Sequence, residues 1–93
     1  MIRTVVLSAS ARKDIKKCPP HIVRKLMGWI GSVQAVGLEN TRQSPGYHDE
    51  PLKGKLAGHR SIRLSNSYRA IYLIMDDGAV EFVLVETVNK HKY

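Results

Sequence analysis

Two short runs of alternating side chains, separated by three turn-forming residues, most constrain what this chain can fold into. Residues 61–64 place Ile62 and Leu64 on one face and polar side chains on the other, and residues 68–73 alternate in the same way. A period of two is that of a β-strand. The Ser-Asn-Ser segment at 65–67 is typical of a hairpin turn. The sequence therefore predicts an antiparallel hairpin.

A turn of three residues would set the register of this hairpin. Leu64 would then pair with Tyr68, and Arg63 with Arg69, which places two guanidinium groups on one face with about 5 Å between their Cβ atoms. Like charges at this spacing cost stability unless an anion lies between them. Arg63 and Arg69 are therefore a candidate anion-binding pair.

The next strand offers a second interpretation of Arg69. An Asp-Asp-Gly turn at 76–78 leads into residues 79–88, AVEFVLVETV, which are apolar enough on both faces to predict an internal strand. If Asp77 and Gly78 form a two-residue turn, the register puts Arg69 opposite Glu86. Arg69 would then be half of a cross-strand ion pair and not an anion ligand.

The N-terminal part predicts one strand followed by two helices. Residues 2–7 are β-branched and apolar, and Ser8 or Ser10 suits the N-cap of a short basic helix that ends at Lys17. Pro19 and Pro20 end that helix and begin the next one.

The second helix, over residues 21–35, has one broad apolar stripe that predicts burial against the core. The stripe consists of Ile22, Leu26, Ile30 and Val33, flanked by Val23 and Met27. Trp29 is expected at the rim of the core. Residues 37–49 are rich in Gly, Pro, Asn and Ser without a period, so a loop is expected there, with His48 on it.

Composition narrows the class of partner. Ninety-three residues suffice for one domain with a modest core. Fifteen Lys and Arg against eight Asp and Glu give a net charge of +7, which favours nucleic acid or an acidic protein as partner, although small solvated domains are often basic too. Cys18, the single cysteine, excludes an intrachain disulfide and is expected to pack in the core. The apolar run at residues 1–8 is too short for a signal peptide or membrane span, so a cytoplasmic protein is expected.

The chemistry that these residues permit is acid–base chemistry. The histidines at 21, 48, 59 and 91 lack metal-ligand spacing, and no nucleophile triad or phosphate-binding glycine loop is present, so no metal or cofactor is expected. The remaining carboxylate, cations, histidine and tyrosines suit metal-independent RNA cleavage. In that reaction a base activates a 2′-hydroxyl, an acid protonates the leaving 5′-oxygen, and cations stabilise the phosphate charge.

The segment EPLKGKLAG at 50–58, the YRAIY strand at 68–72 and the terminal His91 and Tyr93 resemble the RelE/ParE superfamily of bacterial toxins, most closely its YoeB-like and RelE-like RNA-cleaving branches. The resemblance implies an α+β fold over residues 1–93, with an N-terminal strand and two helices packed on an antiparallel sheet of about four strands. It also implies a type II toxin that cleaves mRNA, commonly on the ribosome, and is inhibited by a small acidic antitoxin.

The resemblance also implies roles for single residues. Glu50 would be the general base, Arg69 the main stabiliser of the transition state, His91 the general acid, and Tyr93 a stacking or proton-relay group. The RNA-phosphate ligands would be Lys53, Lys55, Arg63, Lys90 and Lys92. His and Tyr are adjacent in the YoeB-like branch, whereas Lys92 separates them here, so Lys90 or Lys92 is an alternative acid.

Two other functions fit the same resemblance and charge. A ParE-like toxin would inhibit DNA gyrase with this fold and without a nuclease site, and the combination of Glu50, Lys53, Arg69 and His91 argues against it. A non-catalytic module would bind RNA or the ribosome through the basic face without cutting.

Overall fold

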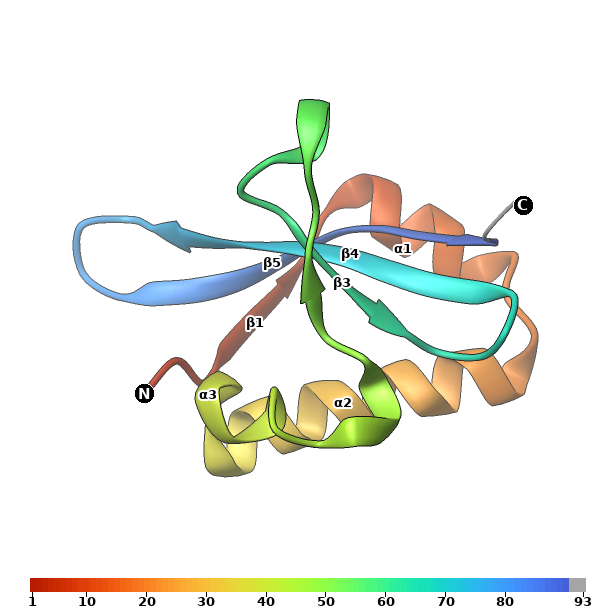
Figure 1. Ribbon diagram of the computed structural model, residues 1–93, viewed down its shortest axis with the longest axis horizontal. Helices are drawn as coiled ribbons and strands as arrows, with labels where there is room; N and C mark the ends of the chain where they lie inside the picture. The colour runs from red at the N-terminus through yellow and green to blue at the C-terminus, as the bar shows by residue number, and fades with distance from the viewer. Residues whose placement is uncertain (91–93) are drawn as a thin grey trace.

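The computed structural model describes residues 1–90 and contains a five-stranded mixed sheet (Figure 1). The strand order is β1-β5-β4-β3-β2. The strands are β1 (Thr4–Leu7), β2 (Glu50–Pro51), β3 (Arg60–Arg63), β4 (Tyr68–Asp76) and β5 (Glu81–Lys90). The helices are α1 (Ala9–Lys16), α2 (Pro20–Val36) and α3 (Leu38–Thr41), with the 3₁₀ turns η1 (Pro45–Tyr47) and η2 (Gly54–Leu56).

The predicted α+β class is confirmed, with two details that the sequence did not indicate. β2 adds a two-residue strand at the edge of the sheet, and β1 runs parallel to β5. The long connection permits the parallel pairing, because β1 and β5 are separated by all the other elements and parallel strands cannot be joined by a tight turn. β5 is internal, as predicted, since β1 and β4 flank it.

Helix α1 begins at the predicted serine and covers an open strand edge. Ser8 is the N-cap, and its Oγ accepts a hydrogen bond from the Ala11 amide at 2.9 Å while donating to the Glu86 carbonyl at 2.7 Å. The Asp14 carboxylate accepts from the Val88 amide at 2.9 Å. These contacts satisfy the edge of β5 beyond the end of β1, where an unpaired strand would otherwise be exposed.

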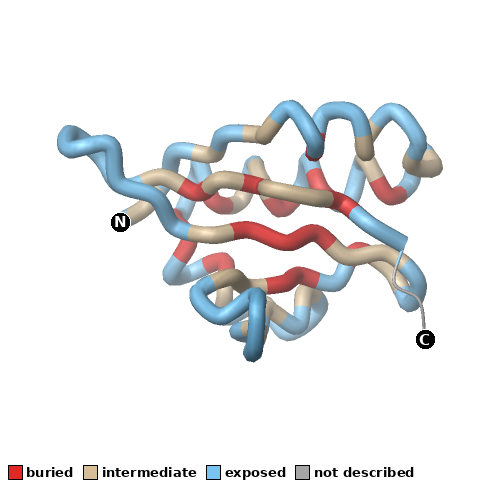
Figure 2. The backbone as a smooth tube through the Cα atoms, turned by 90° about the horizontal axis from the view of Figure 1, so that it is seen from above, coloured by how far each residue is buried: buried red, intermediate tan, exposed pale blue. Residues whose placement is uncertain are grey.

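Helix α2 packs on one face of the sheet, and its buried stripe differs from the predicted one. Trp29 is fully buried, so the expected rim position was wrong, and Ile30 is only partly buried. At 100° per residue, Trp29 lies only 20° from Ile22 around the helix, whereas Ile30 lies 80° away. The Trp29 ring packs on Tyr72 of β4 with centroids 5.1 Å apart. Figure 2 shows that burial concentrates in the central strands and the helix turns that face them.

Two smaller expectations have mixed outcomes. Cys18 is partly buried and packs against the core, as predicted, and burial raises the pKa of its thiol. The segment 37–49, predicted as a loop, contains α3 and η1, and Leu38 and Thr41 of α3 are buried. No helix among residues 1–90 has the length and apolar character needed to cross a bilayer.

The β3–β4 hairpin has the predicted register. Arg63 pairs with Arg69, and the Leu64 amide donates to the Tyr68 carbonyl at 2.9 Å across the three-residue turn.

The predicted β4–β5 register was wrong. Asp76 pairs with Glu81 because the turn spans residues 77–80, where the Asp77 carboxylate accepts from the Ala79 and Val80 amides at 2.9 and 3.0 Å. A bulge between Ile71 and Tyr72 shifts the register further, so Arg69 lies opposite Asn89.

The predicted Arg69–Glu86 ion pair is therefore absent. Glu86 falls at the bulge, between the residues that pair with Ile71 and Tyr72. Its carboxylate instead contacts Nε2 of His59 at 2.6 Å.

Candidate active site

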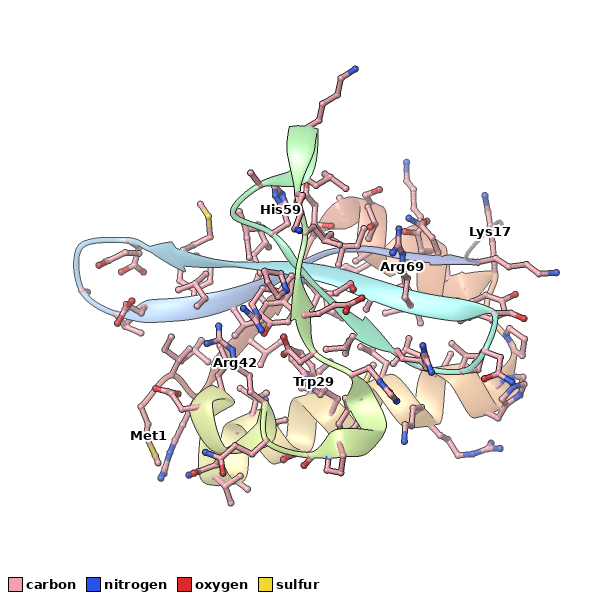
Figure 3. All side chains as sticks on the ribbon, in the orientation of Figure 1. Met1, Lys17, Trp29, Arg42, His59 and Arg69 are labelled. Atoms are coloured by element: carbon pink, nitrogen blue, oxygen red, sulfur yellow. The ribbon has the colours of Figure 1, made fainter. Side chains whose placement is uncertain are left out.

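A pocket of about 190 Å³ opens beside strands β2, β3 and β4. Its lining combines one carboxylate, two guanidinium groups, one imidazole and one phenol with small polar side chains. The lining residues are His48, Glu50, Ser61, Ile62, Arg63, Ser65, Asn66, Tyr68 and Arg69. Figure 3 shows Arg69 on the side of the sheet away from α2, while Trp29 lies on the α2 side.

Strand pairing brings the charged groups together. Glu50 of β2 pairs with Ser61 of β3, and Arg63, two residues further along β3, pairs with Arg69 of β4. Residues two apart in a strand share a face, and directly paired residues share that face too. Glu50, Arg63 and Arg69 therefore project to the same side of the sheet, and all three line the pocket.

The two guanidinium groups have no anionic partner in the part of the chain that the structure describes. Within residues 1–90, neither the Arg63 nor the Arg69 side chain makes a hydrogen bond or ion pair, and the Glu50 carboxylate makes none either. Arg63 is exposed and Arg69 half-buried. Two like charges held side by side without a counter-ion create a positive local potential, which favours binding of an anion with several acceptor oxygens, such as a phosphate.

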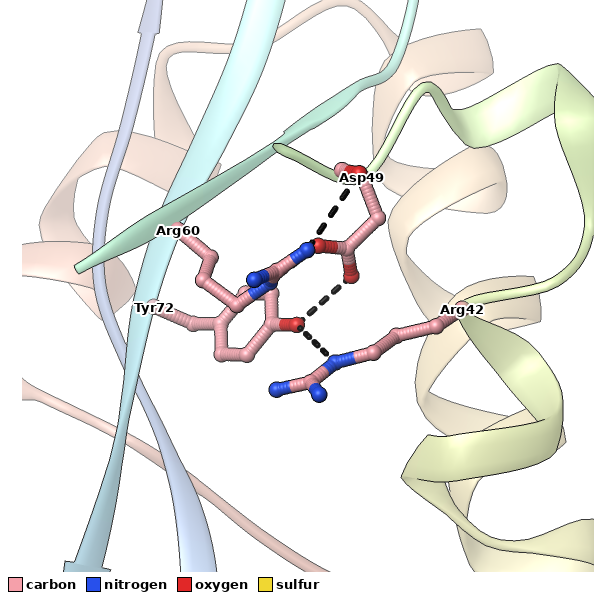
Figure 4. Close-up of polar contacts among 4 residues, drawn as sticks. All are labelled: Arg42, Asp49, Arg60 and Tyr72. Atoms are coloured by element: carbon pink, nitrogen blue, oxygen red, sulfur yellow. Dashed lines mark hydrogen bonds and ion pairs between the residues drawn. The ribbon is translucent and has the colours of Figure 1, made fainter. Parts of the chain in front are cut away.

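A buried polar network fixes the backbone next to Glu50 (Figure 4). The Asp49 side chain is 1% exposed, and its Oδ1 accepts from Nε of Arg60 at 2.6 Å. Its Oδ2 accepts from the hydroxyl of Tyr72 at 2.6 Å, and Nε of Arg42 donates to that hydroxyl at 3.4 Å. Burial and the hydrogen bond to Asp49 raise the pKa of Tyr72 to about 12.

This network anchors Asp49, which lies between His48 and Glu50 in the chain. The side chains of His48 and Glu50 both line the pocket. No sequence motif predicts the Asp49 network, because its members lie far apart in the chain, at positions 42, 49, 60 and 72.

The other predicted residues lie around the pocket or outside the described chain. Lys53 and Lys55 are exposed on the η2 segment and do not line the pocket. Lys90 is exposed at the end of β5, paired with Tyr68, whose side chain does line it. His91, Lys92 and Tyr93 fall outside the described residues, so their predicted roles stay predictions.

Two titratable pocket residues, His48 and Tyr68, had no role assigned from the sequence. Tyr68 belongs to the YRAIY segment, which was noted for its resemblance only, and His48 was expected on a loop. Among residues 1–90, no three His, Cys, Asp or Glu side chains are grouped closely enough to hold a metal ion.

The fold is that of the RelE/ParE-like bacterial toxins, as the sequence resemblance implied. Among solved structures, the YoeB/ParE toxin from Agrobacterium tumefaciens is similar at 23% identity and a TM-score of 0.68, covering 96% of this chain and 99% of that one. YafQ from E. coli has a TM-score of 0.74 at 20% identity, covering 96% and 93%.

A third similar structure is the RelBE2 toxin–antitoxin complex from Mycobacterium tuberculosis. The identity is 26% and the TM-score 0.65, with 98% of this chain and 100% of that one covered. No protein-family model matches the chain, and no curated protein matches it in sequence.

Proposed function

We propose that this protein is the toxin of a type II toxin–antitoxin system and a metal-independent endoribonuclease that cleaves mRNA on the ribosome. The observation that carries the proposal is the Arg63–Arg69 pair in one pocket with the Glu50 carboxylate, none of which has a polar side-chain partner within residues 1–90. The fold shared with YoeB/ParE, YafQ and RelBE toxins supports the toxin assignment.

The chemistry follows from the pocket's charges. The Glu50 carboxylate accepts the proton of a 2′-hydroxyl, the 2′-oxygen attacks the adjacent phosphorus, and the bond from phosphorus to the 5′-oxygen breaks. An acid protonates the departing 5′-oxygen, which leaves a 2′,3′-cyclic phosphate and a 5′-hydroxyl. His91 is the acid that the sequence resemblance implies.

Arg63 and Arg69 act on the charge that develops in this reaction. Negative charge accumulates on the non-bridging phosphate oxygens as the 2′-oxygen attacks, and guanidinium groups already in place stabilise it without reorganisation. The planar fork of arginine can donate to two phosphate oxygens at once. Lys53, Lys55 and Lys90, which are exposed around the pocket, contact flanking phosphates in this proposal.

The partners follow from charge and fold. The net charge of +7 suits both an RNA-rich surface and an acidic antitoxin, and the RelBE2 and Staphylococcus aureus YoeB–YefM structures are toxin–antitoxin complexes of the same fold. We place the protein in the cytoplasm, where mRNA and ribosomes are found.

Induction in bacteria followed by mapping of mRNA 5′ ends tests this function. The wild type should arrest growth and create new 5′ ends within translated codons, whereas Glu50→Gln should leave the mRNA intact. Glu81→Gln is the matched control, because Glu81 is exposed on β5 and is not part of the pocket. Growth arrest with intact mRNA and inhibited gyrase would indicate a ParE-like toxin, and arrest that Glu50→Gln does not relieve would indicate binding without cleavage.

A further inference from the structure

We propose that His48 is a second acid–base group of the pocket and donates the proton to the departing 5′-oxygen. This inference rests on the proposed ribonuclease function and assigns the leaving-group step to a residue on the loop before β2. Three observations support it: the placement of the side chain, its lack of partners, and the conformation of its backbone.

His48 shares the pocket with every charged group of the candidate site. The groups that face it are Glu50 from β2, Arg63 from β3, and Tyr68 and Arg69 from β4. Its ring is exposed and, within residues 1–90, makes no hydrogen bond or ion pair. The imidazole is therefore free to bind substrate and to exchange protons with solvent between reactions.

The backbone of His48 is in the left-handed region, with φ 45° and ψ 49°. It is the one non-glycine residue with positive φ among residues 1–90. Glycine adopts this conformation without steric cost, whereas a side chain at Cβ is strained there. Backbone strain of this kind is often found at functional sites. A histidine at a position that glycine would occupy without strain therefore suggests a function for the imidazole.

The neighbouring residues hold His48 in this position. Its amide donates to the carbonyl of Pro45, the first residue of η1, and Asp49 is anchored on the other side by Arg60 and Tyr72. His48 and Glu50 thus flank a fixed residue and both line the pocket, as a base and an acid of one reaction must.

The proton transfers balance between the two groups. Glu50 takes the 2′-hydroxyl proton as the bond from the 2′-oxygen to phosphorus forms. The His48 imidazolium gives its proton to the 5′-oxygen as the bond from phosphorus to that oxygen breaks. Both groups return to their starting states by exchange with water, and no other reactant is needed. The reaction then requires His48 to carry its proton, so the cleavage rate should fall once the pH is high enough to remove that proton.

The test is the pH profile of single-turnover cleavage of mRNA on programmed ribosomes. His48→Gln should lower the rate by roughly 10² to 10⁴, the usual contribution of a general acid, and should remove the decline at high pH. An mRNA with sulfur in place of the 5′-oxygen at the cut should restore most of that rate, because a thiolate leaves without being protonated. Exposed His21 on α2 supplies the matched control His21→Gln, which should cleave as the wild type does.

A second variant separates chemistry from folding. His48→Gly relieves the backbone strain, so its melting temperature should equal or exceed that of the wild type while cleavage is lost, and added imidazole should restore part of it. The inference is wrong if His48→Gln cleaves within about threefold of the wild type, if the sulfur substrate gives no recovery, or if only His91→Gln removes the pH decline. A wild type that cleaves no RNA overturns the proposed function together with this inference, whereas a cleaving wild type with unaffected His48 variants overturns this inference alone.

Discussion

Arg63 and Arg69 lie directly opposite each other on β3 and β4, and neither contacts a carboxylate within residues 1–90. A cross-strand pair of like charges is unfavourable for folding. The pocket that Glu50 and both guanidinium groups line offers a reason for this pairing, because an anion bound there would offset the repulsion. We therefore expect the pair to stabilise a bound anion and not the empty fold.

Substitution of Arg69 should separate activity from stability. Arg69→Ala should reduce cleavage by about a hundredfold or more, the scale of losing one charge-stabilising donor, and Arg69→Lys should remain largely inactive because it lacks the planar fork. The melting temperature should stay within a few degrees of the wild type, since Arg69 has no ion-pair partner among residues 1–90 and its removal relieves repulsion with Arg63. Cleavage rates and thermal melts check both parts, with exposed Arg24→Ala of α2 as control. Wild-type cleavage by Arg69→Lys would show that the planar fork of Arg69 is not needed to stabilise the phosphate charge.

The salt dependence of RNA binding should report how many phosphates the protein neutralises. Binding of a non-cleavable RNA should weaken linearly in a plot of log affinity against log salt concentration. Arg63→Gln should make the slope shallower by about 0.7, the value for neutralising one phosphate fewer on a single strand. Binding titrations at several salt concentrations measure this slope. An unchanged slope for Arg63→Gln would mean that Arg63 contacts no phosphate.

The Tyr72 hydroxyl should make stability depend on alkaline pH. Its pKa is raised to about 12 in the folded protein from about 10, so its stabilising effect is complete below pH 10 and is lost as pH rises toward 12. Two pKa units correspond to at most about 2–3 kcal/mol. Tyr72→Phe keeps the ring on Trp29 but removes this pH dependence, which denaturant unfolding at pH 8 to 11 would reveal. If both proteins lose stability equally above pH 10, Tyr72 is not the responsible group.

The contact between His59 and Glu86 should contribute little to stability or to cleavage. The Glu86 side chain is 45% exposed, and exposed pairs typically contribute at most about 1 kcal/mol. Glu86→Gln should therefore lower the unfolding free energy by no more than that and leave cleavage unchanged. A double-mutant cycle with His59→Gln isolates the coupling between the two side chains. A large drop in cleavage by Glu86→Gln would show that this pair belongs to the active site.

Much of the fold could be predicted where local signals determine it. Alternation and a three-residue turn were enough to place Arg63 opposite Arg69, and the Pro19–Pro20 pair and the Ser8 cap located helices α1 and α2. The pairing of Arg69 with Glu86 failed, because neither the longer turn after Asp76 nor the bulge beside Tyr72 has a clear sequence signal.

The candidate site was predicted in part for the same reason. Glu50, Arg63 and Arg69 were found from a motif and a register, and they meet in one pocket. The Asp49 network depends on contacts between residues far apart in the chain, so only the folded structure reveals it. The role proposed for His48 rests on its place in the pocket and on a backbone angle, and the sequence specifies neither.

The most direct test of RNA cleavage by 2′-hydroxyl attack is the chemistry of the RNA ends produced on programmed ribosomes. Two mRNAs are compared that differ only in a 2′-deoxynucleotide on the 5′ side of the mapped cut. If the 2′-oxygen is the nucleophile, the all-RNA message is cut to a 2′,3′-cyclic phosphate and a 5′-hydroxyl. The deoxy-substituted message then stays intact, because the attacking oxygen is missing. Cleavage of the deoxy-substituted message, or products that carry a 5′-phosphate, would contradict this mechanism.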